Sequence, residues 1–232
     1  TVVRDSMDWA QVEAAMNLVY TEHDIRNAAK IIAADVARQG DDASSSAKRQ
    51  GLQMFEFVHK RNIDSIQGAG LVSRMWEDWG ADACFVDATG GFGYSWIDQL
   101  ITMGRSPIPV QFAAAAHDSG RYFNKRAEMA FEFVEWIKRG GALPKSPQLK
   151  AALTLTTYTF KGDRLILEPK EDVKVKLGYS PDEFDAAMMT FAEPVTKSAR
   201  VQRANRSAVQ PGYDPFANLE SVVSGSYDPM RP

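Results

Sequence analysis

Three groups of carboxylates limit what this chain can fold into and what it can do. Asp35 ends one apolar segment and Asp87 ends a second one, while Asp182 and Asp185 lie in 180–186, which has the pattern of a helix start. A carboxylate at the end of a buried strand costs free energy unless a cation meets it. Three such positions, far apart in the sequence, predict one site that binds divalent metal.

The composition is that of an ordinary globular protein. The chain has 232 residues, of which 44% are hydrophobic and 25% are charged, so it suits one sizeable domain or one domain with appendages. No window approaches the roughly 18 uninterrupted apolar residues of a transmembrane helix. One cysteine and three dispersed histidines cannot supply a zinc site. Because the first residue is not Met, we expect a piece of a longer protein.

Hydrophobic periodicity and turn residues predict an α/β fold. Helices are expected over 6–20, 65–79, 94–103, 124–139 and from 182 to about 191. Strands are expected over 30–36, 44–49, 52–59, 83–86 and 108–112, and a hairpin over 151–160 and 164–168. The first three strands would form an antiparallel meander, and the next two would join through helical crossovers into a mixed five-stranded sheet.

The order of these elements also predicts the domains and the place of the site. We expect a linker helix over 1–27, a globular domain over 28–196, and a basic and then flexible tail over 197–232. If the crossovers return to the middle of the sheet, Asp35 and Asp87 lie side by side at the carboxyl ends of neighbouring strands. Each carboxylate also has a plainer explanation, as a turn former, a helix cap or an ion-pair partner.

The order and spacing of four segments resemble a known family. Segment 32–42 looks like the opening strand of the nuclease domain of tailed-bacteriophage terminase large subunits, and 86–93 resembles that family's second acidic strand. Segment 122–129 is similar to a helix start common in the family, and 177–191 is similar to its closing helix. The resemblance spans about 28–195. It implies a ribonuclease H-like fold, with the mixed sheet flanked by helices and an added β-hairpin.

The resemblance implies an activity and its setting. The family's nuclease domains are metal-dependent endonucleases that cut concatemeric double-stranded viral DNA during genome packaging, with two divalent ions, Mg or Mn. The implied partners are double-stranded DNA and, in the full assembly, the terminase ATPase domain, the small terminase subunit and the portal, in the cytoplasm of the infected bacterial host, with no membrane. No phosphate-binding loop of the ATPase type occurs here, so no ATPase activity is expected.

The resemblance also implies roles for the acidic residues. Asp35 would lie between the two ions, Asp87 would be the second ligand, and Asp182 would be the third. Asp185, one turn further along the same helix, is the less favoured choice for the third ligand. An auxiliary ligand would come from the turn after the first strand, at Asp41 or Asp42.

Basic residues are candidates for contacts to DNA. Lys125 and Arg126 open a predicted helix, and Lys170 and Lys174 come shortly before the acidic helix start. Each pair is either a solvated surface or a surface that draws phosphate toward the metals. Residues 197–206 hold four cations and no acid, and they either contact DNA or contact another packaging component.

Two other functions compete with the endonuclease. One is a ribonuclease H-like phosphotransferase that uses acids and glycine-rich turns around ATP. The other is a non-catalytic module that docks on DNA or the portal and whose carboxylates are inert. Metal titration distinguishes the docking module from the endonuclease, because a protein with inert carboxylates would gain little stability from magnesium or manganese.

Overall fold

A mixed β-sheet forms the centre of the protein. The computed structural model describes residues 4–5, 7–37 and 43–198. The main sheet has six strands in the order β4-β3-β2-β6-β7, with β5 also paired to β3. Its strands are β2 (Lys30–Asp35), β3 (Ser44–Gln50), β4 (Gln53–Met54), β5 (Val58–Lys60), β6 (Ala83–Asp87) and β7 (Ile108–Val110). Strand β2 is antiparallel to β3 and parallel to β6, and β6 is parallel to β7, which confirms the expected mixed sheet.

The structure differs from the expected five strands at 52–59. This segment is divided into β4 and β5, which pair with different parts of β3. The Met54 N–H donates to the Ala142 carbonyl at 2.9 Å, beyond the end of helix α5 (Lys125–Lys138). Backbone pairing on that side is therefore shared between β3 and a loop, and one continuous strand is not formed.

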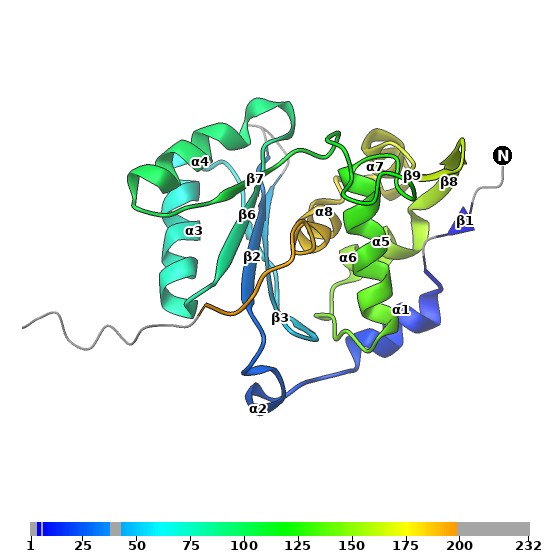
Figure 1. Ribbon diagram of the computed structural model, residues 1–232, viewed down its shortest axis with the longest axis horizontal. Helices are drawn as coiled ribbons and strands as arrows, with labels where there is room; N and C mark the ends of the chain where they lie inside the picture. The colour runs from blue at the N-terminus through cyan, green and yellow to red at the C-terminus, as the bar shows by residue number, and fades with distance from the viewer. Residues whose placement is uncertain (1–3, 6, 38–42, 199–232) are drawn as a thin grey trace, which may run out of the picture. The chain divides into compact units, whose positions relative to one another are not determined.

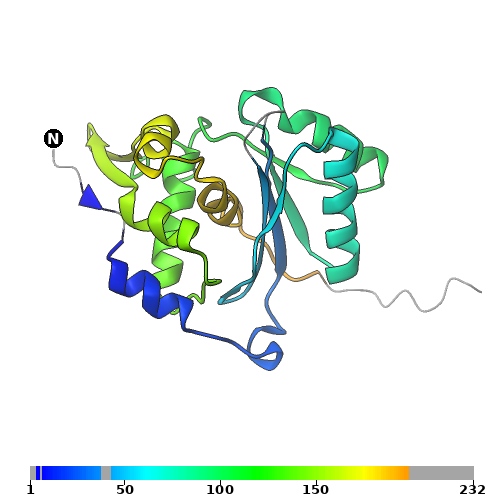
Figure 2. The same cartoon turned by 180° about the vertical axis from the view of Figure 1, so that it is seen from behind.

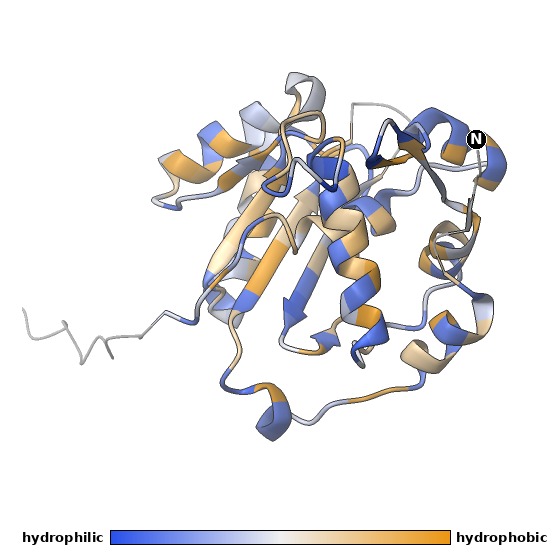
Figure 3. Cartoon of the chain, turned by 45° about the vertical axis from the view of Figure 1, so that its right-hand side comes forward, coloured by the Kyte–Doolittle hydropathy of each residue, from blue (hydrophilic) through white to orange (hydrophobic). Residues whose placement is uncertain are grey.

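Helices cover both faces of this sheet (Figures 1 and 2). Helices α3 (Ser65–Trp79) and α4 (Gly93–Thr102) lie on one face, and α8 (Asp182–Met189) packs across β2 and β3 on the other. Helix α3 agrees with its predicted bounds: Asp64 and Gln67 form a capping box at its start, and Gly80 ends it with a φ of 68°. Figure 3 shows hydrophobic residues along the central strands, next to both helical layers.

A second group of elements packs behind α8. It contains α1 (Trp9–Met16), α5, α6 (Pro147–Leu155) and α7 (Lys170–Leu177), whereas α2 (Glu22–Ile25) lies at the end of β3, where the Ile25 carbonyl accepts from Gln50. It also contains a three-stranded sheet of β1 (Arg4–Asp5), β8 (Thr157–Lys161) and β9 (Arg164–Leu167). Val12 and Met16 of α1 belong to the same apolar core as Phe133 of α5 and Phe184 of α8.

The hairpin of β8 and β9 confirms one prediction and corrects another. The turn at 162–163 is where the sequence predicts it, but 151–155 belong to helix α6 and not to the first strand. Ser146 caps that helix by accepting from the Leu149 N–H, and Pro147 occupies its first position. These cap signals were present in the sequence. Helix α7, where the sequence showed only a basic cluster, was also missed.

The helix expected over 6–20 is shorter, because α1 ends at Met16 and α2 begins at Glu22. The segments 38–42 and 199–232, which carry Asp41, Asp42 and most of the predicted tail, lie outside the described residues. The domain boundaries at 28 and 196 stay predictions. No helix in the described part of the chain is long and apolar enough to cross a membrane.

Candidate functional site

Asp35 and Asp87 occupy adjacent ends of two parallel strands. Strands β2 and β6 are in register at Ala34 and Val86, so the next residue of each strand is one of the two aspartates. Both side chains are buried, with 4% of Asp35 and 8% of Asp87 exposed. The neighbouring positions that the sequence predicted for these carboxylates are therefore present in the fold.

The turn after β6 holds Asp87 in place. The Thr89 N–H donates to Asp87 Oδ1 at 2.8 Å, and the Ala88 N–H donates to the Val110 carbonyl at 2.9 Å. Gly93, the first residue of α4, comes so close that a Cβ there would lie 1.6 Å from the Asp87 carbonyl oxygen. The glycine-rich segment 89–93 thus serves to bring a helix tightly against the strand end.

Helix α8 brings two further carboxylates over the strand ends. Asp185 is fully buried, with 0% exposed, and its N–H donates to the Pro181 carbonyl at 3.0 Å in the first turn. Its Oδ1 accepts no hydrogen bond from a described residue, and its Oδ2 meets the ammonium of Lys170. Asp182 begins the helix, and its Oδ1 accepts a hydrogen bond from the Ser180 hydroxyl. Asp185 therefore points into the fold, and Asp182 lies nearer its edge.

The ammonium of Lys170 is the point where these acids meet. Its Nζ lies 2.6 Å from Asp185 Oδ2, 3.4 Å from Asp35 Oδ2 and 3.9 Å from Asp182 Oδ1. Lys170 is the first residue of α7, so the cation comes from an element that the sequence did not predict. The sequence predicted either a solvated surface or a DNA contact for Lys170, and the structure places it among the carboxylates.

The electrostatics of the site show an excess of negative charge. Burial raises the pKa of Asp35 well above 3.8. Lys170 acts in the opposite direction, but the carboxylates of Asp185, Asp87 and Asp182 add to the increase. Burial also raises the pKa of Asp87, against hydrogen bonds from Thr89 and a shared hydrogen bond with Asp35 that lower it.

These residues fit a hard divalent cation, although the site is not a preformed cage. Among the described residues, no group of three or more His, Cys, Asp or Glu side chains is already arranged to hold a metal ion. The donors are carboxylate oxygens, which Mg²⁺ and Mn²⁺ prefer. Asp185 Oδ1 has no hydrogen-bond partner among the described residues, and one ammonium, that of Lys170, faces three acids. An added cation would supply the missing positive charge after small side-chain shifts.

The other predicted residues lie around this cluster or away from it. Lys174 and Asp182 line a neighbouring cavity of about 490 Å³. In that cavity His59 Nε2 lies 2.8 Å from Glu183 Oε1, and the other Glu183 oxygen accepts from the Ser146 hydroxyl. Asp42 is outside the described residues, so its role as a ligand stays a prediction.

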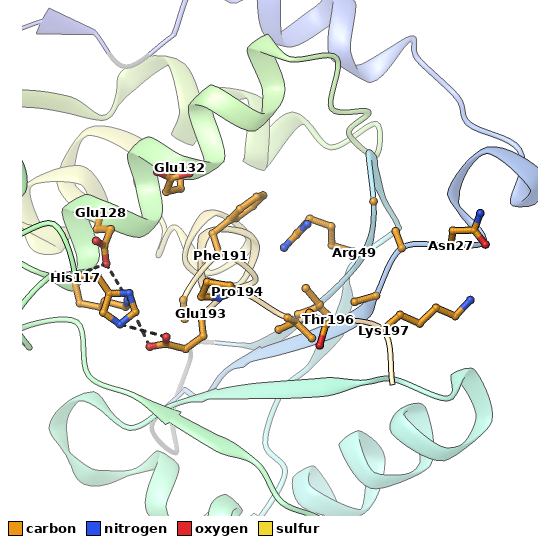
Figure 4. Close-up of a pocket in the computed structure, with 17 residues that line it drawn as sticks. Asn27, Arg49, His117, Glu128, Glu132, Phe191, Glu193, Pro194, Thr196 and Lys197 are labelled. Atoms are coloured by element: carbon orange, nitrogen blue, oxygen red, sulfur yellow. Dashed lines mark hydrogen bonds and ion pairs between the residues drawn. The ribbon is translucent and has the colours of Figure 1, made fainter. Parts of the chain in front are cut away.

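Lys125 belongs to a separate cavity. Its Nζ lies 2.8 Å from Glu128 Oε2 and 3.6 Å from Glu193 Oε1. The cavity has a volume of about 700 Å³, and Figure 4 shows His117, Glu128 and Glu193 on one side of it and Arg49 on the other. The Lys125 ammonium is already neutralised inside the protein, and a DNA contact at this residue stays a prediction.

Comparisons with known proteins identify the fold. The nuclease domain of the large terminase subunit gp2 of bacterial virus Sf6 superposes with a TM-score of 0.70 at 21% identity, covering 82% of this chain and 100% of that chain. The chain has the terminase nuclease fold. A mutant of the Sf6 domain solved with manganese gives a TM-score of 0.68 at 20% identity, over 82% of this chain and 100% of that chain.

A second terminase nuclease is a more distant structural neighbour. The large terminase nuclease from thermophilic phage G20c has a TM-score of 0.53 at 11% identity, covering 72% of this chain and 83% of that chain. No family model matches the sequence. No curated protein sequence matches it either. At these identities the neighbours establish the ribonuclease H-like mixed sheet of the terminase nuclease fold, which confirms the predicted fold class.

Proposed function

We propose that this chain is the metal-dependent DNA endonuclease domain of a viral genome-packaging terminase. The observation that carries the proposal is the convergence of Asp35 and Asp185 on the ammonium of Lys170, next to Asp87 at the carboxyl ends of the central parallel strands. The terminase nuclease fold and the manganese and calcium bound to the Sf6 domain support it.

In this proposal the carboxylates hold two divalent ions, Mg or Mn. Asp35 would be the shared ligand, Asp87 would bind from the end of β6, and Asp185 would be the third ligand. We favour Asp185 over Asp182 because Asp185 is fully buried and lies closer to Lys170. When bound, two such ions activate a water molecule and stabilise the leaving oxygen of a phosphodiester.

The chain's own residues position this site. The Thr89 N–H fixes the rotamer of Asp87, and Lys170 holds Asp35 and Asp185 together by attraction to both. Asp182, at the start of α8, flanks the site and lies 3.9 Å from the Lys170 ammonium. Burial of the cluster keeps the carboxylates desolvated, so they bind cations strongly.

The substrate and partners follow from the same proposal. The substrate is concatemeric double-stranded DNA, cut by phosphodiester hydrolysis during packaging in the cytoplasm of the bacterial host. The partners are the ATPase domain of the same terminase, the small terminase subunit and the portal.

Plasmid cleavage with manganese or magnesium tests the proposal. We expect the wild type to nick and linearise plasmid DNA, and Asp35→Asn, Asp87→Asn and Asp185→Asn to reduce the rate by at least about a hundredfold. Asp182→Asn should reduce the cleavage rate less than these three variants do. The control is Asp98→Asn, whose side chain is exposed on α4. Full cleavage by the three cluster variants would refute the site.

A further inference from the structure

A cleft beside the carboxylate cluster is not used by the residues described so far. It has a volume of about 790 Å³ and lies between the hairpin of β8 and β9 and the beginning of α5. Thr89 and Lys170 belong both to its lining and to the cluster. A strand of nucleic acid that places one phosphate at the carboxylates would therefore have this cleft next to it.

Arg126 lines the cleft and has little to neutralise it. The side chain is buried, with 8% of the residue exposed, and its Nη1 donates to the Glu168 carbonyl at 2.6 Å. Its Nε and Nη2 have no hydrogen-bond partner among the described residues. An arginine stays charged at every physiological pH, so a buried guanidinium with two unpaired edges is costly unless an anion arrives.

Glu168, whose carbonyl accepts from Arg126, has its carboxylate engaged with other groups. Glu168 Oε1 accepts from the Thr157 N–H at 2.6 Å, and Glu168 Oε2 lies 2.5 Å from Lys176 Nζ. Arg126 therefore receives only the backbone oxygen of this residue. Its position in the first turn of α5 adds the positive end of the helix dipole to its own charge. The charge of Arg126 and the dipole of α5 both favour an anionic ligand.

The rest of the cleft is mostly apolar. Its walls include Phe112, which is buried, and Tyr158 and Phe160 on β8, and Phe160 has 52% of its surface exposed. A guanidinium at one side and aromatic rings along the wall suit a nucleotide, because the phosphate meets the cation and the sugar and base meet the rings.

We propose that Arg126 binds the phosphate of a nucleotide flanking the scissile phosphodiester, and that the cleft holds the sugar and base of that nucleotide. This inference rests on the proposed endonuclease function. The unpaired nitrogens of Arg126 are covered from solvent, so its side chain turns toward the cleft as the phosphate arrives. One hydrogen bond, to the Glu168 carbonyl, now holds the guanidinium. The rotation of the side chain exchanges this bond for stronger hydrogen bonds to phosphate.

Binding of a fluorescent DNA duplex in EDTA tests the inference without any cleavage. We expect Arg126→Met to weaken binding about tenfold and to reduce the slope of log K against log salt concentration by about one. The matched control is Arg139→Met at the other end of α5, where the arginine side chain is 67% exposed; it should bind like the wild type. Equal affinity and equal salt slope for Arg126→Met and the wild type would overturn the proposal.

Thermal unfolding separates phosphate binding from a structural role. Met keeps the apolar stem of the side chain and removes the unpaired charge, so Arg126→Met should melt no lower than the wild type. A variant that melts lower and binds DNA with unchanged affinity would show that Arg126 only supports the fold.

Single methylphosphonate substitutions locate the phosphate. In the wild type, one neutral phosphate beside the cleavage position should lower affinity as much as Arg126→Met does, and the same substitution should cost Arg126→Met nothing further. Equal losses in both proteins would overturn the assignment. If the wild type fails to cleave with manganese but Arg126→Met still loses affinity and salt dependence, the proposed function falls and the phosphate subsite stands.

Discussion

The Nζ of Lys170 lies 2.6 Å from Oδ2 of Asp185, and each residue comes from the first turn of a different helix. The positive end of α7 adds to the charge of Lys170, and the positive end of α8 favours the carboxylate of Asp185. The attraction of Asp185 and Asp35 raises the pKa of Lys170 even though burial acts to lower it. The ammonium is therefore charged and holds the acids together in the absence of metal.

Replacing Lys170 with Met should destabilise the metal-free protein. The change leaves Asp35 and Asp185 facing each other without a cation, which we expect to cost about 1–2 kcal/mol of unfolding free energy for a partly buried pair. Manganese should remove most of this loss, because the added cation takes over the charge compensation. Urea unfolding in EDTA and in manganese measures both effects. The control is Lys138→Met, which removes the exposed ion pair with Glu135 and should change the unfolding free energy by less than about 0.5 kcal/mol. The same loss with and without metal would contradict the prediction.

Asp35→Asn should stabilise the metal-free protein, and the gain should grow with pH. Burial raises the folded-state pKa of Asp35 above 3.8, so the folded state binds the proton more tightly than the unfolded chain does. The unfolding free energy of the wild type therefore falls as the pH rises from about 4 through the folded pKa. The variant lacks this loss and should gain about 1 kcal/mol or more at pH 7. Urea unfolding in EDTA at pH 5 and pH 7 measures the gain, and a pH-independent difference would argue against it.

Gly93→Ala should disturb the strand end that carries Asp87. The new Cβ would lie 1.6 Å from the Asp87 carbonyl oxygen, so the helix or the strand must move. We expect a loss of about 2–4 kcal/mol in unfolding free energy and slower cleavage. Gly70→Ala in α3 is the control, because its Cβ would meet nothing within 4 Å, and it should stabilise the helix by about 0.5–1 kcal/mol. Chemical denaturation of both variants measures the two changes. An equally small effect of Gly93→Ala would show that the contact with the Asp87 carbonyl tolerates a Cβ.

Glu183→Gln should lower the pKa of His59. The hydrogen bond from His59 to Glu183 raises the histidine pKa above its ordinary 6.5. The pair stabilises the fold below that value, and its contribution is lost as the pH rises through the folded pKa. An NMR titration of the His59 ring should show the pKa falling toward 6.5 in the variant. An unchanged His59 titration would mean that the contact is absent in solution.

Local patterns in the sequence determined much of the sheet and several helices. Apolar segments ending at Asp35 and Asp87 predicted two strand ends, and the structure confirms that they are neighbours. Helix α3 was predicted at its observed bounds from its apolar face and from Gly80, which ends it one residue after Trp79. Such signals act over one turn or one strand, so they can be read without knowledge of the fold.

The tertiary structure alone decided which residues meet. Asp182 and Asp185 are almost one helical turn apart, so either can face the strand ends, and the packing of α8 on β2 and β3 selects Asp185 for the buried side. Lys170 reaches the same point from α7, and nothing near it in the sequence indicates this. The physical reason is that burial and charge pairing depend on distances between elements far apart in the chain, and those distances exist only after the helices have packed on the sheet.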